Sequence, residues 1–190
     1  MPNYYEFKVK ITGIDPPVER HFLLRITAKF GDLHHAIRAA FGWQTEARWE
    51  FRANHDGPVI AEPGDAEELY LEAVGAAPDA HRTRLKTWFE EPIERRSCVY
   101  ISDLGDDWRH DVTLVGLRHA PGTFQRKLLG GDRACPPSDS GGLAGYARCL
   151  VFFETGEDPW GEDALDVEDW LGDWNPEDFE LEEVAATFDR

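Results

Sequence analysis

The sequence has few cysteines, no long apolar run and no internal repeat. Its three cysteines, Cys98, Cys135 and Cys149, are odd in number and form no CxxC pair, so a disulfide framework is not indicated. No apolar run is long enough to span a membrane, and we recognise no export signal. We therefore expect reduced thiols, a cytoplasmic location and no membrane partner.

Basic residues are almost absent from the end of the chain. The net charge is −17, but residues 154–190 hold 15 acidic residues and one basic residue, so the preceding body carries only −3. Proteins that bind nucleic acids gain affinity by neutralising phosphates with lysine and arginine. We therefore expect no nucleic-acid partner, and we interpret the basic residues between Arg82 and Arg96 as a solvated face.

The spacing of apolar residues predicts an α+β fold. Alternating stretches indicate a mixed, largely antiparallel sheet built from hairpins, and stretches with helical spacing indicate helices packed on it. A length of 190 residues suits a single domain spanning 1–190. Apart from the central hairpin described below, the expected strands are 4–11, 18–26, 47–53 and 58–61, with a turn at 54–57. The expected helices are 30–41, a short turn at 85–89, 143–153 and one after Asn175, while 62–80 is expected to be a long excursion with a short helix.

The helix expected over 30–41 carries two adjacent histidines, His34 and His35. Adjacent positions of a helix point about 100° apart, so the two side chains cannot grip one metal ion together. We interpret both as surface residues. Thr27 is the expected N-cap of this helix and Gly42 its expected C-terminal stop.

The acidic segment 154–190 is expected to fold back onto the body. Its tryptophans, Trp160, Trp170 and Trp174, make it too aromatic for a disordered acidic tail. Asn175 is the predicted cap of the last helix, with Pro176 at the first helical position. The predicted apolar stripe of that helix is Leu181, Val184, Ala185 and Phe188, and that of the preceding helix is Leu143, Tyr146, Leu150 and Phe153.

Two stretches collect most of the residues that could do chemistry. Residues 98–114 alternate on both sides of a Gly/Asp turn and predict a hairpin, and residues 134–146 are rich in turn formers. Because function tends to lie in loops on a rigid scaffold, we expect the two stretches to meet around a pocket. The candidate binding residues are Asp103, Asp106, Trp108, His110, Cys135, Asp139 and Tyr146.

Ordinary structural roles compete with function at these positions. A histidine on an apolar face, such as His110, is more often bonded to a backbone carbonyl than to a ligand. The aspartates of the Gly/Asp turn are more simply caps of backbone amides than a cation site. Trp108 and Tyr146 could equally be core anchors, in which case both stretches are determinants of the fold.

The same two stretches resemble a known family. Residues 103–110 (DLGDDWRH) and 134–146 (ACPPSDSGGLAGY) are similar to the YDFGDxWxH and CPPEDxGGxxGY elements of the plasmid pRiA4b ORF-3-like family. Residues 5–9, 41–43 and 175–179 also look like landmarks of that family, so the resemblance covers almost the whole chain. It implies an α+β domain and an association with mobile elements.

The chain departs from the family pattern at several positions. Ser102 and Leu104 replace the family's Tyr and Phe, and Ser140 stands where the family often has a cysteine. A zinc site built on Cys135 and His110 would lack thiolate partners, because tetrahedral structural sites need four ligands. We therefore expect no metal and no cofactor.

The sequence leaves three functions open. The first is a non-catalytic binding or accessory module that holds a partner protein segment or a small ligand between the two stretches. The second is a hydrolytic or metal-dependent enzyme that uses Asp103, Asp106, His110 and Asp139. The third is a DNA-associated protein of a mobile element, which the acidic balance disfavours. We prefer the binding module and assign no catalytic residue.

Overall fold

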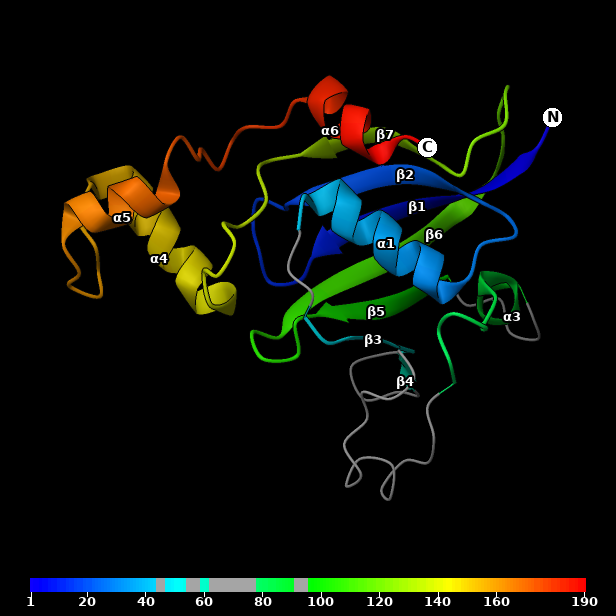
Figure 1. The fold of residues 1–190 in the computed structure, drawn as a ribbon, viewed down its shortest axis with the longest axis horizontal. Helices are drawn as coiled ribbons and strands as arrows, with labels where there is room; N and C mark the ends of the chain where they lie inside the picture. Colours follow the sequence, from blue (N-terminus) through cyan, green and yellow to red (C-terminus); the bar gives the residue numbers. More distant parts are fainter. Residues whose placement is uncertain (44–46, 54–58, 62–77, 91–95) are drawn as a thin grey trace, which may run out of the picture.

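A seven-stranded antiparallel sheet forms the centre of the molecule (Figure 1). The computed structural model describes residues 1–43, 47–53, 59–61, 78–90 and 96–190. The strand order is β4-β3-β5-β6-β1-β2-β7. The strands are β1 (Asn3–Ile11), β2 (Glu19–Arg25), β3 (Trp49–Arg52), β4 (Val59–Ala61), β5 (Ser97–Ser102), β6 (Trp108–His119) and β7 (Arg126–Asp132). The predicted α+β class and the antiparallel sheet are confirmed.

The alternation in the sequence predicts which face of β1 is buried. In β1, Tyr5, Phe7 and Val9 are completely buried beneath the helices. The central hairpin also forms as predicted, because β5 pairs with β6 and places Trp108 and His110 on the buried side. β6 also pairs with β1 along most of its length, so the hairpin is fixed at the middle of the sheet.

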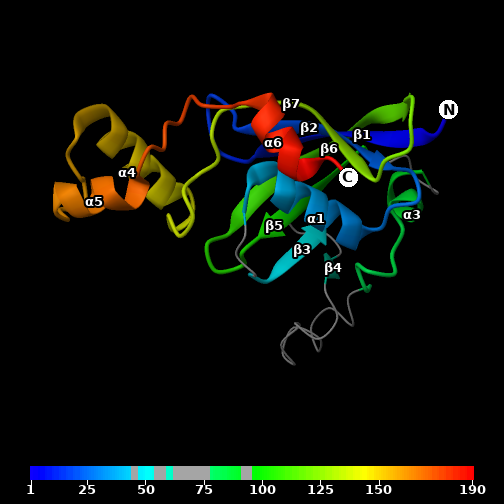
Figure 2. The ribbon, with the colours of Figure 1, turned by 45° about the horizontal axis from the view of Figure 1, so that its top comes forward.

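Helices cover one face of the sheet. In Figures 1 and 2, α1 (Phe30–Phe41) and α6 (Leu181–Phe188) lie side by side on that face, and α3 (Leu85–Phe89) lies near one end of α1. Phe188 of α6 is completely buried and packs on Phe22 of β2. Gly42 ends α1 in the left-handed conformation, as predicted.

The predicted helix starts need correction. Lys29, not Thr27, is the N-cap of α1, and its backbone amide donates to the carboxylate of Asp32. Asn175 does not cap α6, which begins at Leu181; its side chain accepts from the amide of Glu177 and closes a separate turn.

The prediction of two surface histidines is wrong for His34. Its ring stacks on Trp49 with centroids 3.8 Å apart, and Nδ1 lies 2.8 Å from the hydroxyl of Tyr100. Burial is the largest cause that lowers the pKa of His34, to about 3. His34 is buried because β3 and β5 lie beneath this side of α1 and contact the imidazole through Trp49 and Tyr100. His35 is exposed, as predicted.

Two helices project from one end of the sheet. α4 (Gly142–Thr155) and α5 (Ala164–Leu171) together form what we call the helical extension, which Figures 1 and 2 place beyond the sheet rather than over a face. Tyr146 and Cys149 of α4 are buried, but Leu143 and Phe153 are 45% and 47% exposed. The predicted apolar stripe of this helix is therefore only partly buried. The predicted turn at 54–57 and most of the predicted excursion at 62–80 lie outside the described residues.

Candidate functional site

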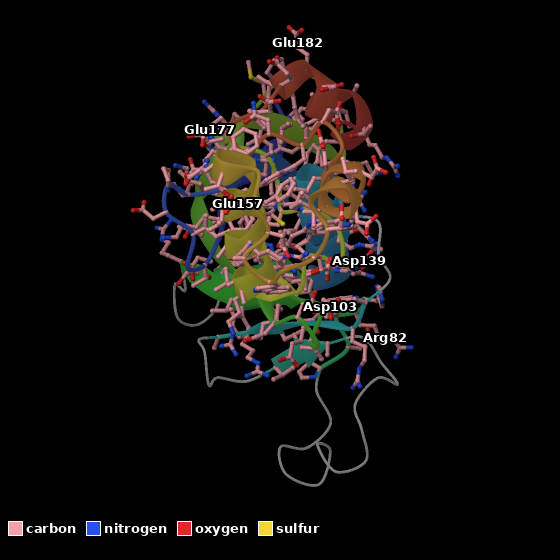
Figure 3. The ribbon with its side chains drawn as sticks, turned by 90° about the vertical axis from the view of Figure 1, so that its left-hand side faces the viewer. Arg82, Asp103, Asp139, Glu157, Glu177 and Glu182 are labelled. Atoms are coloured by element: carbon pink, nitrogen blue, oxygen red, sulfur yellow. The ribbon has the colours of Figure 1, made fainter. Side chains whose placement is uncertain are left out.

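The two stretches singled out in the sequence meet at one end of the sheet. Gly142, the first residue of α4, lies so close to the turn between β5 and β6 that a Cβ there would be 2.6 Å from the carbonyl oxygen of Asp106. Figure 3 shows Asp103 and Asp139 on this side of the molecule. A small hollow lies between the two loops. It is lined by Trp43, Ala47, Ser102, Asp103, Asp106, Trp108, Pro137, Ser138 and Asp139.

The hollow is too small for an organic ligand. Its volume is about 30 Å³, which is comparable to the share of one water molecule in the liquid. Asp103 adopts a left-handed conformation and accepts hydrogen bonds from the amides of Gly105 at 2.9 Å and Asp106 at 3.3 Å. This is the predicted amide cap. The prediction that Asp103, Asp106, Trp108 and Asp139 bind a ligand stays a prediction.

His110 lies behind the hollow, in the core. Its Nδ1 is 3.3 Å from the carbonyl oxygen of Tyr100, and the rings of Phe41 and Trp43 meet it edge to face. Burial lowers the pKa of His110 to about 4, so the imidazole is neutral at pH 7. The opposite nitrogen, Nε2, has no hydrogen-bond partner in the described structure. A completely buried neutral imidazole cannot exchange protons with a substrate held at Asp139.

Cys135 lies at a different place, beside Arg20. The Arg20 guanidinium is 3% exposed, donates to Cys135 Sγ at 3.1 Å and lies over the ring of Phe179. Burial raises the pKa of Cys135 to about 11, and the nearby guanidinium opposes that rise only in part. The thiol is therefore protonated at pH 7, which leaves it a poor nucleophile and a poor metal ligand.

Tyr146 also acts as a packing residue. Its ring is 3% exposed and meets Trp174 edge to face, with centroids 6.1 Å apart. The indole of Trp174 in turn donates to the carbonyl oxygen of Cys135. Tyr146 thus joins α4 to the segment that leads into α6. Across the part of the chain that the structure describes, no three His, Cys, Asp or Glu side chains are grouped closely enough to hold a metal ion.

The helical extension carries a surface that the sequence prediction missed. Trp160 is 58% exposed, Trp170 is 41% exposed and Leu165 is 70% exposed. The Arg148 guanidinium lies 4.6 Å from the ring centroid of Trp160 and 6.0 Å from that of Trp170. The tryptophans were expected to fold onto the body, and only Trp174 packs against the core in that way. The signal in the sequence was that acidic residues surround both tryptophans between 157 and 173.

Comparison with known proteins settles the family. The model of the plasmid pRiA4b ORF-3-like protein family matches residues 3–183. The chain belongs to this family. A curated relative, the uncharacterized protein y4hQ of Sinorhizobium fredii (strain NBRC 101917 / NGR234), is 30% identical over 166 residues, which cover 87% of this chain and 79% of the relative.

A solved structure shares the fold. The crystal structure of MM3350, a protein of unknown function from Methanosarcina mazei Go1, superposes with a TM-score of 0.79 and 27% sequence identity. The match covers 96% of this chain and 97% of the other. The helices of the described structure include none that is long and apolar enough to cross a membrane. The chain therefore shares the fold of these relatives, neither of which has an assigned activity.

Proposed function

We propose that this pRiA4b ORF-3-like chain is a non-catalytic module that binds a basic, partly apolar segment of another protein through its helical extension. The observation that carries the proposal is the exposure of Trp160 and Trp170 beside Arg148. Tryptophan is among the residues that contribute most to binding energy when a protein interface covers them.

Ion pairs hold this surface in place. Arg148 Nε donates to Asp158 Oδ1 at 2.6 Å, and its Nη2 lies 2.9 Å from Glu162 Oε2. The Arg148 side chain is only 10% exposed. Its guanidinium is therefore held in place, and the two indoles pack beside it. A surface that is already ordered loses little conformational entropy on binding, which favours affinity.

The charge of the extension decides the kind of partner. Residues 154–173 contain nine acidic residues and no basic one, and Asp158 and Glu162 account for the pairs with Arg148. The remaining carboxylates would repel a second copy of the same surface and would repel nucleic acid. They favour lysine and arginine side chains around an apolar anchor that covers the indoles.

The two sequence motifs support the surface rather than form it. Gly142 against Asp106, and Tyr146 against Trp174, fasten the extension to the sheet. The neutral, enclosed imidazole of His110 favours binding over catalysis. We also propose a cytoplasmic location, which the three free thiols support. The association with mobile elements that the family resemblance implies stays a prediction.

Binding to synthetic peptides tests the proposal. Fluorescence anisotropy would compare three labelled twelve-residue peptides: one with alternating leucine and lysine or arginine, one with glutamate in place of the basic residues, and one with serine in place of leucine. We expect the first to bind most tightly. Trp160→Ala should weaken its binding about thirtyfold, as expected for an interface hot spot.

Matched variants distinguish specific binding at this surface from nonspecific binding to other exposed apolar residues. Leu117→Ala removes a side chain of similar exposure (56%) from β6, away from the extension, and should change affinity less than about twofold. Asp166→Asn and Asp169→Asn each remove one negative charge from the extension and should weaken binding of the basic peptide. Asp111→Asn removes one negative charge from β6 and is the control, which should leave that binding unchanged. Equal losses for Trp160→Ala and Leu117→Ala, or equal binding of the basic and acidic peptides, would refute the proposal. Self-association through the indoles would show as a dimer in light scattering and would also refute it.

A further inference from the structure

A larger concavity lies on the body, along α1 and away from the helical extension. Its volume is about 640 Å³, within the range of sites that bind small organic molecules. The cleft runs between α1, the neighbouring ends of β2 and β7, and the last residue. It is lined by Leu24, Arg25, Asp32, His35, Ala39, Trp43, Gln125, Arg126 and Arg190, none of which belongs to the extension.

Pairing of the backbone brings three arginines to this cleft from distant parts of the sequence. The amide of Arg25, at the end of β2, donates to the carbonyl oxygen of Gln125 at 3.0 Å. Arg126 begins β7 and pairs with Leu24. The amide of Arg190 donates to the carbonyl oxygen of Arg126 at 3.2 Å. Arg25 and Arg126 therefore stand on neighbouring strands at one end of the sheet, and Arg190, which follows α6, lies beside them.

Arg126 is the buried member of this group. Arg126 is only 9% exposed. Nε donates to the carbonyl oxygen of Phe188 at 2.6 Å, and Nη1 donates to that of His35 at 3.3 Å. Burial and the neighbouring Arg190 both lower the pKa of Arg126, and Asp189 opposes them. Two carbonyl groups satisfy these hydrogen-bond donors but bring no full negative charge.

The acidic side chains near the cleft accept hydrogen bonds from backbone amides. Asp32 accepts from the amide of Lys29 at the start of α1, and Asp189 accepts from the amide of Leu128. Among the described ion pairs, none joins a carboxylate to Arg25, Arg126 or Arg190. Buried charges in proteins are normally paired, because burying an unpaired charge is costly. Arg126 is such a buried cation without a carboxylate partner among the described ion pairs, and Arg25 and Arg190 place two more positive charges beside it.

We infer that this cleft binds a small organic anion and that the arginines hold its carboxylate or phosphate group. Arginine suits this role, because its planar guanidinium donates two parallel hydrogen bonds to such groups. His35 and Ala39 lie four residues apart on one side of α1, and Trp43 follows the end of that helix. Together they give the cleft a less polar wall for the rest of the ligand. The inference is independent of the proposed protein-binding surface.

Nuclear magnetic resonance of the arginine Nε–Hε groups tests the inference with inorganic phosphate and with citrate as separate probes. We expect at least one of them to shift the Arg126 signal and to saturate, with sodium chloride at equal ionic strength having no such effect. Saturation by phosphate alone would assign a phosphate ligand, and saturation by citrate alone a carboxylate ligand. Arg190→Gln and Arg25→Gln should each weaken binding about tenfold, the effect of losing one charged hydrogen-bond donor.

Control variants distinguish a loss of anion binding from a loss of folding. Arg126→Gln could unfold the chain, so the two less buried arginines carry the test. Arg82→Gln is the matched control, since Arg82, labelled in Figure 3, is a well-exposed arginine that does not line the cleft. The inference is overturned if neither anion saturates the Arg126 signal, or if Arg82→Gln weakens binding as much as Arg190→Gln does.

Discussion

Gly142 lies directly against the backbone carbonyl of Asp106, and this contact joins the helical extension to the sheet. The two residues belong to the two motifs that the sequence singled out, and they are separated by more than thirty positions. A Cβ on Gly142 would approach the Asp106 oxygen to 2.6 Å. The motif glycine is thus required by a close backbone approach as well as by its positive φ of 72°.

The neighbouring glycine offers a matched test of this contact. Gly141 also has a positive φ, 81°, but a Cβ there would meet nothing within 4 Å. Gly141→Ala should cost about 1 kcal/mol of unfolding free energy from backbone strain alone. Gly142→Ala should cost about 3 kcal/mol, because the Asp106 turn must also move. Urea unfolding of both variants measures the difference, and equal costs would show that the contact is not important.

The buried histidines make stability depend on pH. The pKa of His110 is lowered to about 4 and that of His34 to about 3, so protonation favours the unfolded chain in both cases. Their contribution is complete above about pH 6.5 and is lost as the pH falls toward 4, by about 1.4 kcal/mol per pH unit for each histidine. Urea unfolding between pH 7.5 and 5 measures this slope.

His110→Phe tests the assignment of one of these protons. The variant should lower the slope of unfolding free energy against pH by about 1.4 kcal/mol per pH unit, which corresponds to one proton, because it removes the titrating group from the buried site. His119→Gln is the control, since His119 is an exposed residue at the end of β6. An unchanged slope in His110→Phe would mean that His110 is protonated in the folded chain as readily as in the unfolded one.

The three thiols should be unreactive in the folded protein. Burial is the largest cause that raises the pKa of Cys98, Cys135 and Cys149, that of Cys135 to about 11. Because the thiolate is the reactive form, modification by a disulfide reagent at pH 8 should be at least about a hundredfold slower than in denaturant. All three thiols should react once the chain unfolds. Rapid native modification of Cys135 would contradict the neutral thiol beside Arg20.

Arg148 should control the order of the indoles without affecting the sheet. Arg148→Met removes the pairs with Asp158 and Glu162 and the contact with Trp160. Hydrogen exchange should become faster between residues 157 and 171 and stay unchanged in β1 and β6. Arg118→Gln, which breaks an exposed pair with Glu6, is the control. Faster exchange throughout the chain would mean that Arg148 stabilises the whole fold.

The sequence predicts the sheet well because alternation reports burial directly. The stretches around Phe7, Trp49 and Trp108 are predicted as strands and form strands, and the predicted amide cap forms at the Asp103 turn. The meeting of the two motifs was also expected. What the sequence could not give is the volume left between them, since that depends on how closely Gly142 approaches Asp106.

The missed features depend on contacts between distant segments. His34 is buried because β3 and β5 lie beneath α1, and spacing within the helix carries no record of that. Trp160 and Trp170 were expected to fold inward because aromatic residues usually do. Their exposure follows from the projection of α4 and α5 beyond the sheet. The cleft with three arginines forms only when β2, β7 and the end of the chain pair.

The central claim is that the exposed indoles of the extension receive a basic protein segment. The most direct measurement is a titration of the tryptophan indole signals by nuclear magnetic resonance with the leucine and lysine or arginine peptide. The account predicts saturable shifts at Trp160 and Trp170, with the buried Trp49 and Trp88 unchanged. Shifts centred on Trp43 and Trp108 would instead place binding at the hollow between the two motifs and would contradict the account.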